Sequence, residues 1–397
     1  MDYKHITSQR QLTDFCNSLR DAPLIGFDTE FVSEDTYRPD LCLIQVAAGD
    51  RMAVIDPKAV DDVTPFWELI TSPGHETIVH AGREEFRFCL TATGKRPHNL
   101  FDIQIAAALI GLEYPAAYGT LVRKMLNGKL HKGETRSDWR RRPLSQRQLE
   151  YALDDVVYLE PLRNALVKKI ENLKRRMWLE SEMTDWQASV EHAESEERWR
   201  RVSGIASLSS RALAIVRELF RWRDEEANRR NRPAKRILRD DLLVELAKRQ
   251  SADPKRISAI RGMERRELKN QYAEIAKCVD RALSLADSQC PRPQERSRTQ
   301  QLNALGQFLT TALGSISRAA KVAPGLVGTS QDVRELVAHH LGLEQFDEPP
   351  ALSLGWRAEV VGQQIEKLIK GELCLRITDP LSDHPLAFEP AEPQDSR

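Results

Sequence analysis

The sequence lacks the features that mark membrane-embedded, secreted and zinc-stabilised proteins. No apolar run approaches the roughly 18 residues that a membrane span needs, and the charged first ten residues contain no apolar core of a secretory signal. The six cysteines include no CxxC pair, which favours reduced thiols packed in the interior over a disulfide framework or a zinc site. We therefore expect a cytoplasmic protein that does not enter the membrane.

The chain also lacks an excess of charge of either sign. Its 59 lysine and arginine residues balance 59 aspartate and glutamate residues, so the formal net charge is +0. Any nucleic-acid site must therefore come from a local cluster of cations. Hydrophobic residues make up 41% and charged residues 30% of the 397 residues, a balance typical of globular proteins, and this length predicts two or three domains.

The first 110 residues alternate between strand-like and helix-like segments. Apolar runs at 24–31, 41–47 and 52–55 follow one another through short connections, which favours an antiparallel meander. A fourth strand is predicted at Thr77–His80, and it leads into a helix over Glu84–Leu90. This order predicts an α/β domain with a mixed sheet flanked by helices.

From about residue 145 onward the pattern is helical, and we predict no further strand. Ser145–Gln148 has the form of a capping box, so a helix should begin there. The later segments are, in order, a helical connector at 170–203, a helical region at 208–285, a polar linker at 287–298, a second helical region at 301–375 and a flexible, Pro- and acid-rich end.

Two acids, Asp28 and Glu30, interrupt the first apolar run. Residues i and i+2 of a strand project from the same face, so both carboxylates should point the same way. Their repulsion and desolvation are costly unless cations neutralise them, and hard divalent ions such as Mg²⁺ are the natural counter-charge. A strand end with two solvated acids is the alternative interpretation.

Tyr151 and Asp155 form a second pair of candidate residues. They stand at i and i+4, so the phenol and the carboxylate should share one face of the predicted helix. Apolar residues around them indicate that this face lies close to the core. A core tyrosine beside a surface aspartate would give the same pattern.

Taken together, these residues resemble the ribonuclease D family of exonucleases. Phe27–Phe31 followed by Tyr37–Gln45 is similar to the first exonuclease motif of that family. Ser137–Leu144 followed by Tyr151–Leu159 is similar to its third motif, in the variant that contains a tyrosine. The second motif has its landmarks in His80-Ala81-Gly82 and in Phe101–Gln104.

The resemblance continues beyond the catalytic part of the chain. Leu219–Asp224, Asn231–Pro233 and Asp240–Leu243 resemble an HRDC domain, a small helical module that binds nucleic acid. Gly355–Arg357, with Glu359 and Gly362, resembles the second HRDC-type domain of bacterial ribonuclease D.

This resemblance implies a ribonuclease H-like α/β catalytic domain followed by two all-α HRDC-type domains. The expected units are an exonuclease domain at 1–170, a connector at 171–207, an HRDC domain at 208–288, a second HRDC-type domain at 299–376 and a flexible tail at 377–397.

One position departs from the family pattern. The third acid of the family is an aspartate five residues after the histidine of the His-Ala-Gly landmark, and here that position is Glu85. A glutamate keeps the charge but moves the carboxylate outward by roughly 1.5 Å on a fixed backbone. Asp102 is the alternative acid, although its place at the start of a helix is explained more simply by an N-cap. We predict that Glu85 belongs to the metal site.

The family resemblance implies a two-metal mechanism that uses Mg²⁺ or Mn²⁺, with the two ions about 3.5–4 Å apart. By analogy, Asp28 bridges both ions, and Glu30 and Asp155 complete the shell of the first. Glu85 supports the second ion, directly or through water. Tyr151 holds and orients the attacking water, because a phenol with a pKa near 10 is a poor base at pH 7.

Two clusters of cations are candidate RNA contacts. Arg140, Arg141 and Arg142 precede the Tyr151 helix, where a phosphate backbone could approach the site, and a solvated loop is the alternative. The HRDC-like segment holds the second cluster, which could bind phosphates without sequence preference or could be a solvated helix end balanced by nearby acids. Its members are Arg229, Arg230, Arg232, Lys235 and Arg236.

The leading hypothesis is a 3′→5′ exoribonuclease that releases 5′-mononucleotides from single-stranded ends of structured RNA, such as tRNA precursors. We expect a monomer without a protein partner. A 3′→5′ DNA exonuclease is one alternative, because the related catalytic domain also occurs in helicase-linked DNA proteins. In another, Glu85 marks a degenerate catalytic domain, and the chain is an RNA-binding protein. The HRDC-type tail and the intact Asp28, Glu30, Tyr151 and Asp155 favour the exoribonuclease.

Overall fold

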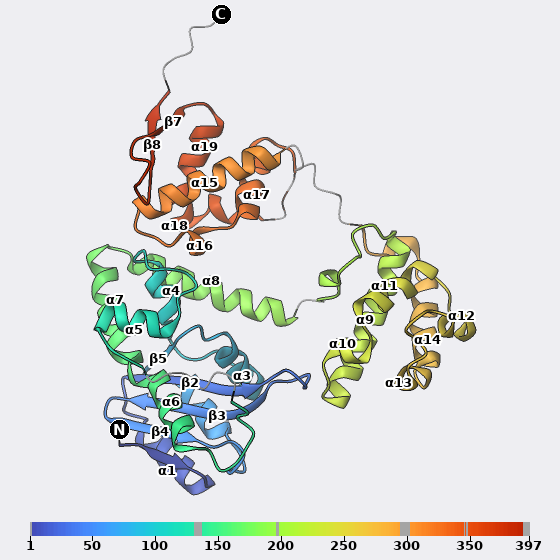
Figure 1. The fold of residues 1–397 in the computed structure, drawn as a ribbon, viewed down its shortest axis with the longest axis horizontal. Coiled ribbons are helices and arrows are strands. Elements are labelled where there is room, and N and C mark those ends of the chain that lie inside the picture. Colours follow the sequence, from blue (N-terminus) through green and yellow to red (C-terminus); the bar gives the residue numbers. More distant parts are fainter. Residues whose placement is uncertain are drawn as a thin grey trace, which may run out of the picture.

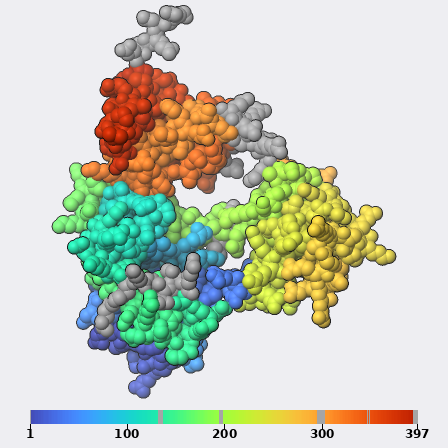
Figure 2. All heavy atoms as spheres, viewed as in Figure 1, coloured from blue at the N-terminus to red at the C-terminus, as the bar shows by residue number. Residues whose placement is uncertain are grey.

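The structure, a computed structural model, has an N-terminal α/β domain, a middle helical domain and a C-terminal domain that is mostly helical (Figure 1). The helix α8 (Arg176–Ser195) extends from the N-terminal domain toward the middle domain (Figure 1). Figure 2 shows the N-terminal domain touching both of the others. The residues that the structure describes are 2–130, 137–195, 198–293, 302–344, 346 and 348–391.

A six-stranded mixed sheet forms the centre of the N-terminal domain, with the strand order β1-β4-β3-β2-β5-β6. β2, β3 and β4 form the predicted antiparallel meander, and the remaining neighbours pair in parallel. This confirms the mixed sheet. The strands are β1 (Lys4–Ile6), β2 (Leu24–Val32), β3 (Asp40–Ala48), β4 (Arg51–Ile55), β5 (Glu76–Val79) and β6 (Leu100–Asp102).

Helices cover both faces of this sheet, because β2 and β3 carry apolar side chains on both sides. On one face Phe27 packs edge-to-face against Phe66 and Trp67. This layer contains α1 (Gln9–Ser18), α2 (Thr64–Thr71) and α3 (Arg83–Thr93). The other face is covered by α6 (Gln146–Val157) and α7 (Leu159–Asn172), and α4 (Ile103–Ala108) and α5 (Tyr118–Leu126) pack against α7.

The middle domain has a hydrophobic core of its own, built around Leu213, Leu243 and Val279. It follows the short 3-10 helix η1 (Arg198–Arg201). Its helices are α9 (Ser210–Arg230), α10 (Ala234–Ile237), α11 (Asp240–Arg249), α12 (Pro254–Ser258), α13 (Arg266–Lys269) and α14 (Tyr272–Leu283), followed by the 3-10 helix η2 (Asp287–Gln289).

The loop between β2 and β3 joins the N-terminal domain to the middle domain through polar contacts. The Tyr37 hydroxyl donates to Asp224 at 2.6 Å, and Arg38 Nε donates to Asn228 at 2.9 Å. The Asn231 side-chain oxygen accepts from the backbone N–H groups of Tyr37 and Arg38, at 3.2 Å each. The C-terminal end of α9 therefore docks on the segment that follows Glu30.

The C-terminal domain, in contrast, shares its hydrophobic core with α4, α5, α7 and α8. A buried ion pair reinforces this contact, because Glu182 of α8 accepts from Arg357 at 2.7 and 2.9 Å and from the Trp356 indole at 3.2 Å. The helices are α15 (Asn303–Ala319), α16 (Pro324–Val327), α17 (Ser330–His340), α18 (Gly355–Arg357) and α19 (Gln363–Ile369), with the 3-10 turn η4 (Ala351–Ser353) and the π-turn η5 (Ala358–Gly362).

Two predictions about the end of the chain are wrong. Strands do occur after residue 145, because β7 (Leu373–Ile377) and β8 (Leu386–Pro390) pair as an antiparallel hairpin. Residues 378–391 are therefore folded rather than a flexible tail. Packing of Phe388 on the C-terminal core overrides the polar composition of this segment. Residues 294–298 of the expected linker and the last six residues lie outside the described residues.

In the described part of the chain, no helix combines the length and the apolar character needed to cross a membrane. The expected boundaries of the domains stay predictions.

Candidate active site

Asp28 and Glu30 project from β2 toward the layer of α6 and α7. A Cβ added to Gly26 would lie 3.0 Å from the Leu159 side chain of α7, so residue 26 faces this layer. Because strand residues alternate between faces, residues 28 and 30 face the same way. Both side chains are half-buried. The two carboxylates therefore share one face, as the spacing predicted.

Tyr151 and Asp155 lie one turn apart on α6, which covers β2 and β3. The predicted capping box fixes where this helix begins, since Ser145 and Gln148 each satisfy the backbone N–H of the other. The Tyr151 hydroxyl donates a hydrogen bond to the Asp155 carboxylate. The ring of Trp139 lies 6.1 Å from the Tyr151 ring, between centroids. The phenol of Tyr151 is thus held beside the Asp155 carboxylate.

Glu85 comes from the first turn of α3, on the other side of β2. It is 5% exposed, and its Oε1 accepts from the Thr29 hydroxyl at 2.5 Å. The helix can begin this close to the end of β5 because residue 82 is glycine: a Cβ there would lie 2.3 Å from Val79 Cγ2. The charge of Glu85 acts on Asp28, which places the two acids near each other.

Asp102, the alternative acid, is engaged by the backbone. Its Oδ1 accepts from the N–H of Gln104 at 2.7 Å, which confirms the predicted N-cap of α4. The same side chain accepts from Ala81 at 3.1 Å and from Gly82 at 2.9 Å. Asp102 therefore holds the turn that starts α3 and orients Glu85, which is a structural role.

The four carboxylates repel one another in a partly dry environment. Burial, followed by the charges of Glu85, Asp155 and Glu30, raises the pKa of Asp28 well above its ordinary value. Burial and the charges of Asp155 and Glu85 raise the pKa of Glu30 to about 8. Burial is also the main reason that the pKa of Glu85 and that of Asp155 are each raised to about 7. In the described part of the chain, no cationic side chain offsets this repulsion at Asp28, Glu30 or Asp155.

This donor set fits hard divalent cations, since it offers carboxylate oxygens and an uncompensated negative charge. The side chains are not yet arranged for coordination, because no three histidine, cysteine, aspartate or glutamate groups among the described residues could hold one ion as they stand. Two of the four are turned to protein partners, Glu85 to Thr29 and Asp155 to Tyr151. Because a carboxylate has two oxygens, each of these acids can keep its hydrogen bond on one oxygen and offer the other to a cation.

Comparisons with known proteins identify the family of this chain. The family model described as 3′-5′ exonuclease matches residues 3–171, and the HRDC domain model matches residues 212–279. Ribonuclease D of Granulibacter bethesdensis is 33% identical over 94% of this chain and 94% of its own. Ribonuclease D of Sphingobium indicum is 34% identical over 94% of this chain and 96% of its own.

The chain belongs to the ribonuclease D family. Its fold resembles the crystal structure of Escherichia coli RNase D, described as an exoribonuclease involved in structured RNA processing, with a TM-score of 0.81 and 27% identity over 93% of this chain and 99% of that one. The N-terminal domain is the 3′–5′ exonuclease domain, and the middle domain is the HRDC domain. The chain is accordingly a hydrolytic 3′–5′ exoribonuclease of a family that is metal-dependent in general.

Of the three arginines before α6, Arg142 is the one most engaged within the protein, and the RNA contacts expected of all three stay predictions. Its guanidinium pairs with Asp56 at 2.6 and 2.7 Å and donates to the carbonyls of Cys42 and Trp139, at 2.8 Å each. It ties the segment before α6, the helix that carries Tyr151, to β3 and to the residue that follows β4. Arg140 pairs with Asp35 at 2.9 Å and with Asp138, whereas the Arg141 side chain is 85% exposed.

The basic run of the HRDC domain is largely neutralised by neighbouring acids. Glu226 pairs with both Arg229 and Arg230, and Glu267 pairs with Arg232 at 3.3 Å. Asp240 lies 3.2 Å from Lys235, and Arg236 is exposed. This arrangement agrees with the interpretation as a balanced helix end, and the RNA contacts expected of these residues stay predictions.

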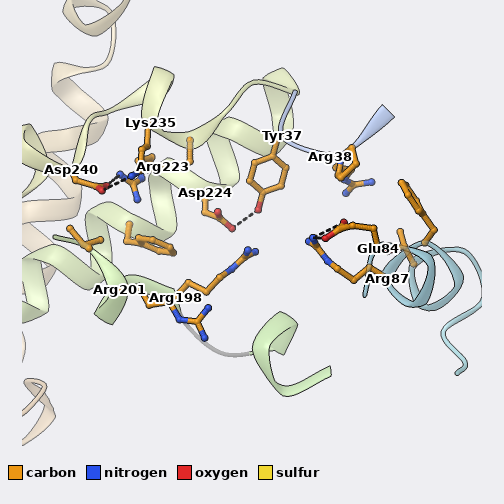
Figure 3. A pocket seen from close by; sticks show the side chains of 16 residues that line it. Tyr37, Arg38, Glu84, Arg87, Arg198, Arg201, Arg223, Asp224, Lys235 and Asp240 are labelled. Atoms are coloured by element: carbon orange, nitrogen blue, oxygen red, sulfur yellow. Dashed lines mark hydrogen bonds and ion pairs between the residues drawn. The ribbon is translucent and has the colours of Figure 1, made fainter. Parts of the chain in front are cut away.

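The structure reveals a basic cleft between the exonuclease and HRDC domains, which motif spacing did not predict. This cleft of about 840 Å³ is formed by the β2–β3 loop, α3, η1, α9 and α10 (Figure 3). Its charged residues are six cations, Arg38, Arg87, Arg198, Arg201, Arg223 and Lys235, and three acids, Glu84, Asp224 and Asp240. These residues are scattered through the chain, so only the folded arrangement brings their charges together.

Replacing Arg142 should expose its structural role. Arg142→Leu removes the ion-pair partner of Asp56, whose side chain is 4% exposed, and leaves it only the Lys58 backbone N–H, so we expect a loss of about 1–3 kcal/mol in the free energy of unfolding. The neighbouring Arg141→Leu is the matched control, with an expected change within about 0.5 kcal/mol. Urea denaturation of both variants measures this difference, and equal stabilities would contradict the assignment of Arg142.

Proposed function

We propose that this chain removes nucleotides one at a time from RNA 3′ ends, in the cytoplasm, and releases 5′-mononucleotides. Single-stranded ends of tRNA precursors are the expected substrates. The observation that supports this proposal is the convergence of four carboxylates and one tyrosine from β2, α3 and α6 in the exonuclease domain. The reaction would use two divalent ions, Mg²⁺ or Mn²⁺, for which Asp28, Glu30, Glu85 and Asp155 would provide the oxygen ligands.

When bound, such ions supply a hydroxide nucleophile and stabilise the charge on the attacking and leaving oxygens. Asp28 and Glu30 would bind from a rigid strand, which sets where the scissile phosphate must lie. Asp155 would bind from α6, whose first turn is fixed by its capping box. Glu85 would reach the site from α3, with the Thr29 hydroxyl bound to one of its two carboxylate oxygens.

Tyr151 would orient the attacking water rather than remove its proton. Burial, followed by the charges of Asp155, Glu30 and Asp28, raises the pKa of Tyr151 above its ordinary value, so the phenol stays protonated at neutral pH. A neutral hydroxyl can donate one hydrogen bond and accept others, which suits it to holding a water molecule in line with the scissile bond.

The basic cleft would guide the RNA strand behind its 3′ end. One wall is α3, which carries Glu85, and another is the β2–β3 loop, which follows Glu30. Cations outnumber acids in the lining, and phosphate neutralisation is the main source of sequence-independent affinity for nucleic acid. Tyr37 and Phe88 add aromatic surface on which bases could stack.

Labelled substrates test the proposed activity directly. We expect RNA with a label in its 3′-terminal nucleotide to release labelled 5′-mononucleotide with Mg²⁺ or Mn²⁺, and we expect chelation or Asp28→Asn to stop this release. Release from DNA alone would support a DNA exonuclease instead. RNA binding without release from either substrate would support a catalytically degenerate RNA-binding protein.

The role of Tyr151 can be separated from substrate binding. Tyr151→Phe removes the hydroxyl and keeps the ring against Trp139, so we expect kcat to fall by about 100-fold, as for a misplaced reacting group, with little change in RNA affinity. Tyr158→Phe, at the end of the same helix, is the control and should leave kcat unchanged. An unchanged rate for the Tyr151 variant would remove this residue from the mechanism.

The basic cleft makes a prediction about salt dependence. Arg198→Gln removes one lining cation, so RNA affinity should fall for all sequences, and the slope of log K against log salt should drop by about 0.7. Arg200→Gln is the matched control on the same short helix, because Arg200 stacks on Trp199 at 4.4 Å and does not line the cleft. Equal salt slopes for wild type and Arg198→Gln would place the strand elsewhere.

A further inference from the structure

Gln45 carries a buried amide with no hydrogen-bond partner. The residue lies in the middle of β3 and is 0% exposed. Neither its Nε2 nor its Oε1 has a partner among the described residues. Buried polar side chains are almost always paired, because leaving a donor or an acceptor unsatisfied in a dry environment is costly. An apolar side chain would suit this position better if packing were its only role.

The amide lies on the carboxylate face of the sheet. Gln45 stands directly opposite Asp28 in the antiparallel pairing of β2 with β3. Directly opposite residues project from the same face with Cβ atoms roughly 4.5–5.5 Å apart. The neighbouring pair along the same face is Glu30 with Leu43, and on β4 the residue opposite Gln45 is Val54. The neighbour of Gln45 on β2 is therefore the polar Asp28, while its neighbours Leu43 on β3 and Val54 on β4 are apolar.

The amide has the hydrogen-bond donors that the four carboxylates lack. An ionised carboxylate can only accept hydrogen bonds, whereas an amide has both donors and an acceptor. Gln45 Nε2 can thus donate to an Asp28 oxygen that is not used for coordination. Its Oε1 can accept from a water molecule in the site. Groups that hydrogen-bond to metal ligands in this way fix the orientation of those ligands and tune metal affinity.

We propose that Gln45 is a positioning residue that holds the Asp28 carboxylate in the orientation that binds divalent metal. This inference rests on the proposed metal-dependent function and adds a residue to it. Before metal binds, the amide is unsatisfied, and when metal binds, it gains its partner. Gln45 therefore lowers the stability of the metal-free protein and raises its affinity for the metal.

Opposite effects on these two properties test the proposal. Gln45→Met keeps an unbranched chain of similar length and removes the amide, so the melting temperature of the chelated protein should stay equal or rise. Affinity for Mn²⁺, measured by calorimetry, should fall by about 10- to 100-fold, and the rise in melting temperature with Mg²⁺ should shrink. Leu43→Met is the matched control, two residues away on the same face, and should bind Mn²⁺ as wild type does.

A second variant covers the case in which the first fails to fold. Gln45→Leu also removes the amide and adds no charge, so it should also weaken Mn²⁺ binding. Equal Mn²⁺ affinity of wild type and either folded variant would overturn the role of Gln45, as would strong destabilisation of the chelated protein by Gln45→Met. A wild-type chain that binds neither Mn²⁺ nor Mg²⁺ would instead overturn the proposed two-metal function, and this inference with it.

Discussion

Repulsion among four carboxylates is the constraint on which the rest of this structure depends. Asp28, Glu30, Glu85 and Asp155 come from one strand and two helices, and each has a raised pKa because burial and neighbouring charge disfavour its ionised form. Such an arrangement lowers the stability of the metal-free fold. The surrounding structure must therefore hold the acids in place, largely through contacts that their carboxylates do not make themselves.

Hydrogen bonds at the starts of α3 and α6 provide such contacts. Asp102 accepts from the two backbone N–H groups of the turn before α3, and Gly82 allows that turn to approach Val79. At the other helix, the capping box of Ser145 fixes the first turn of α6. Other polar groups thus fix the helix ends that carry Glu85 and Asp155, and each of these two acids has only one side-chain hydrogen bond of its own.

The two helical domains are attached in physically different ways. The C-terminal domain shares an apolar core with the exonuclease domain, reinforced by the buried Glu182–Arg357 pair. The HRDC domain has its own core and meets the exonuclease domain through polar contacts of the β2–β3 loop. Polar interfaces of this kind are compatible with relative motion, and the basic cleft lies at this interface.

The sequence by itself determined the sheet meander, the shared face of Asp28 and Glu30, the capping box and the N-cap role of Asp102, because these follow from local periodicity and capping chemistry. It could not decide which arginine forms an ion pair with a buried acid, since Asp56, the partner of Arg142, lies 86 positions away in the chain. Tertiary contacts also decide that the polar C-terminal segment forms the β7–β8 hairpin and that the cations of the basic cleft lie together. Those outcomes depend on contacts between segments far apart in sequence, which local patterns do not encode.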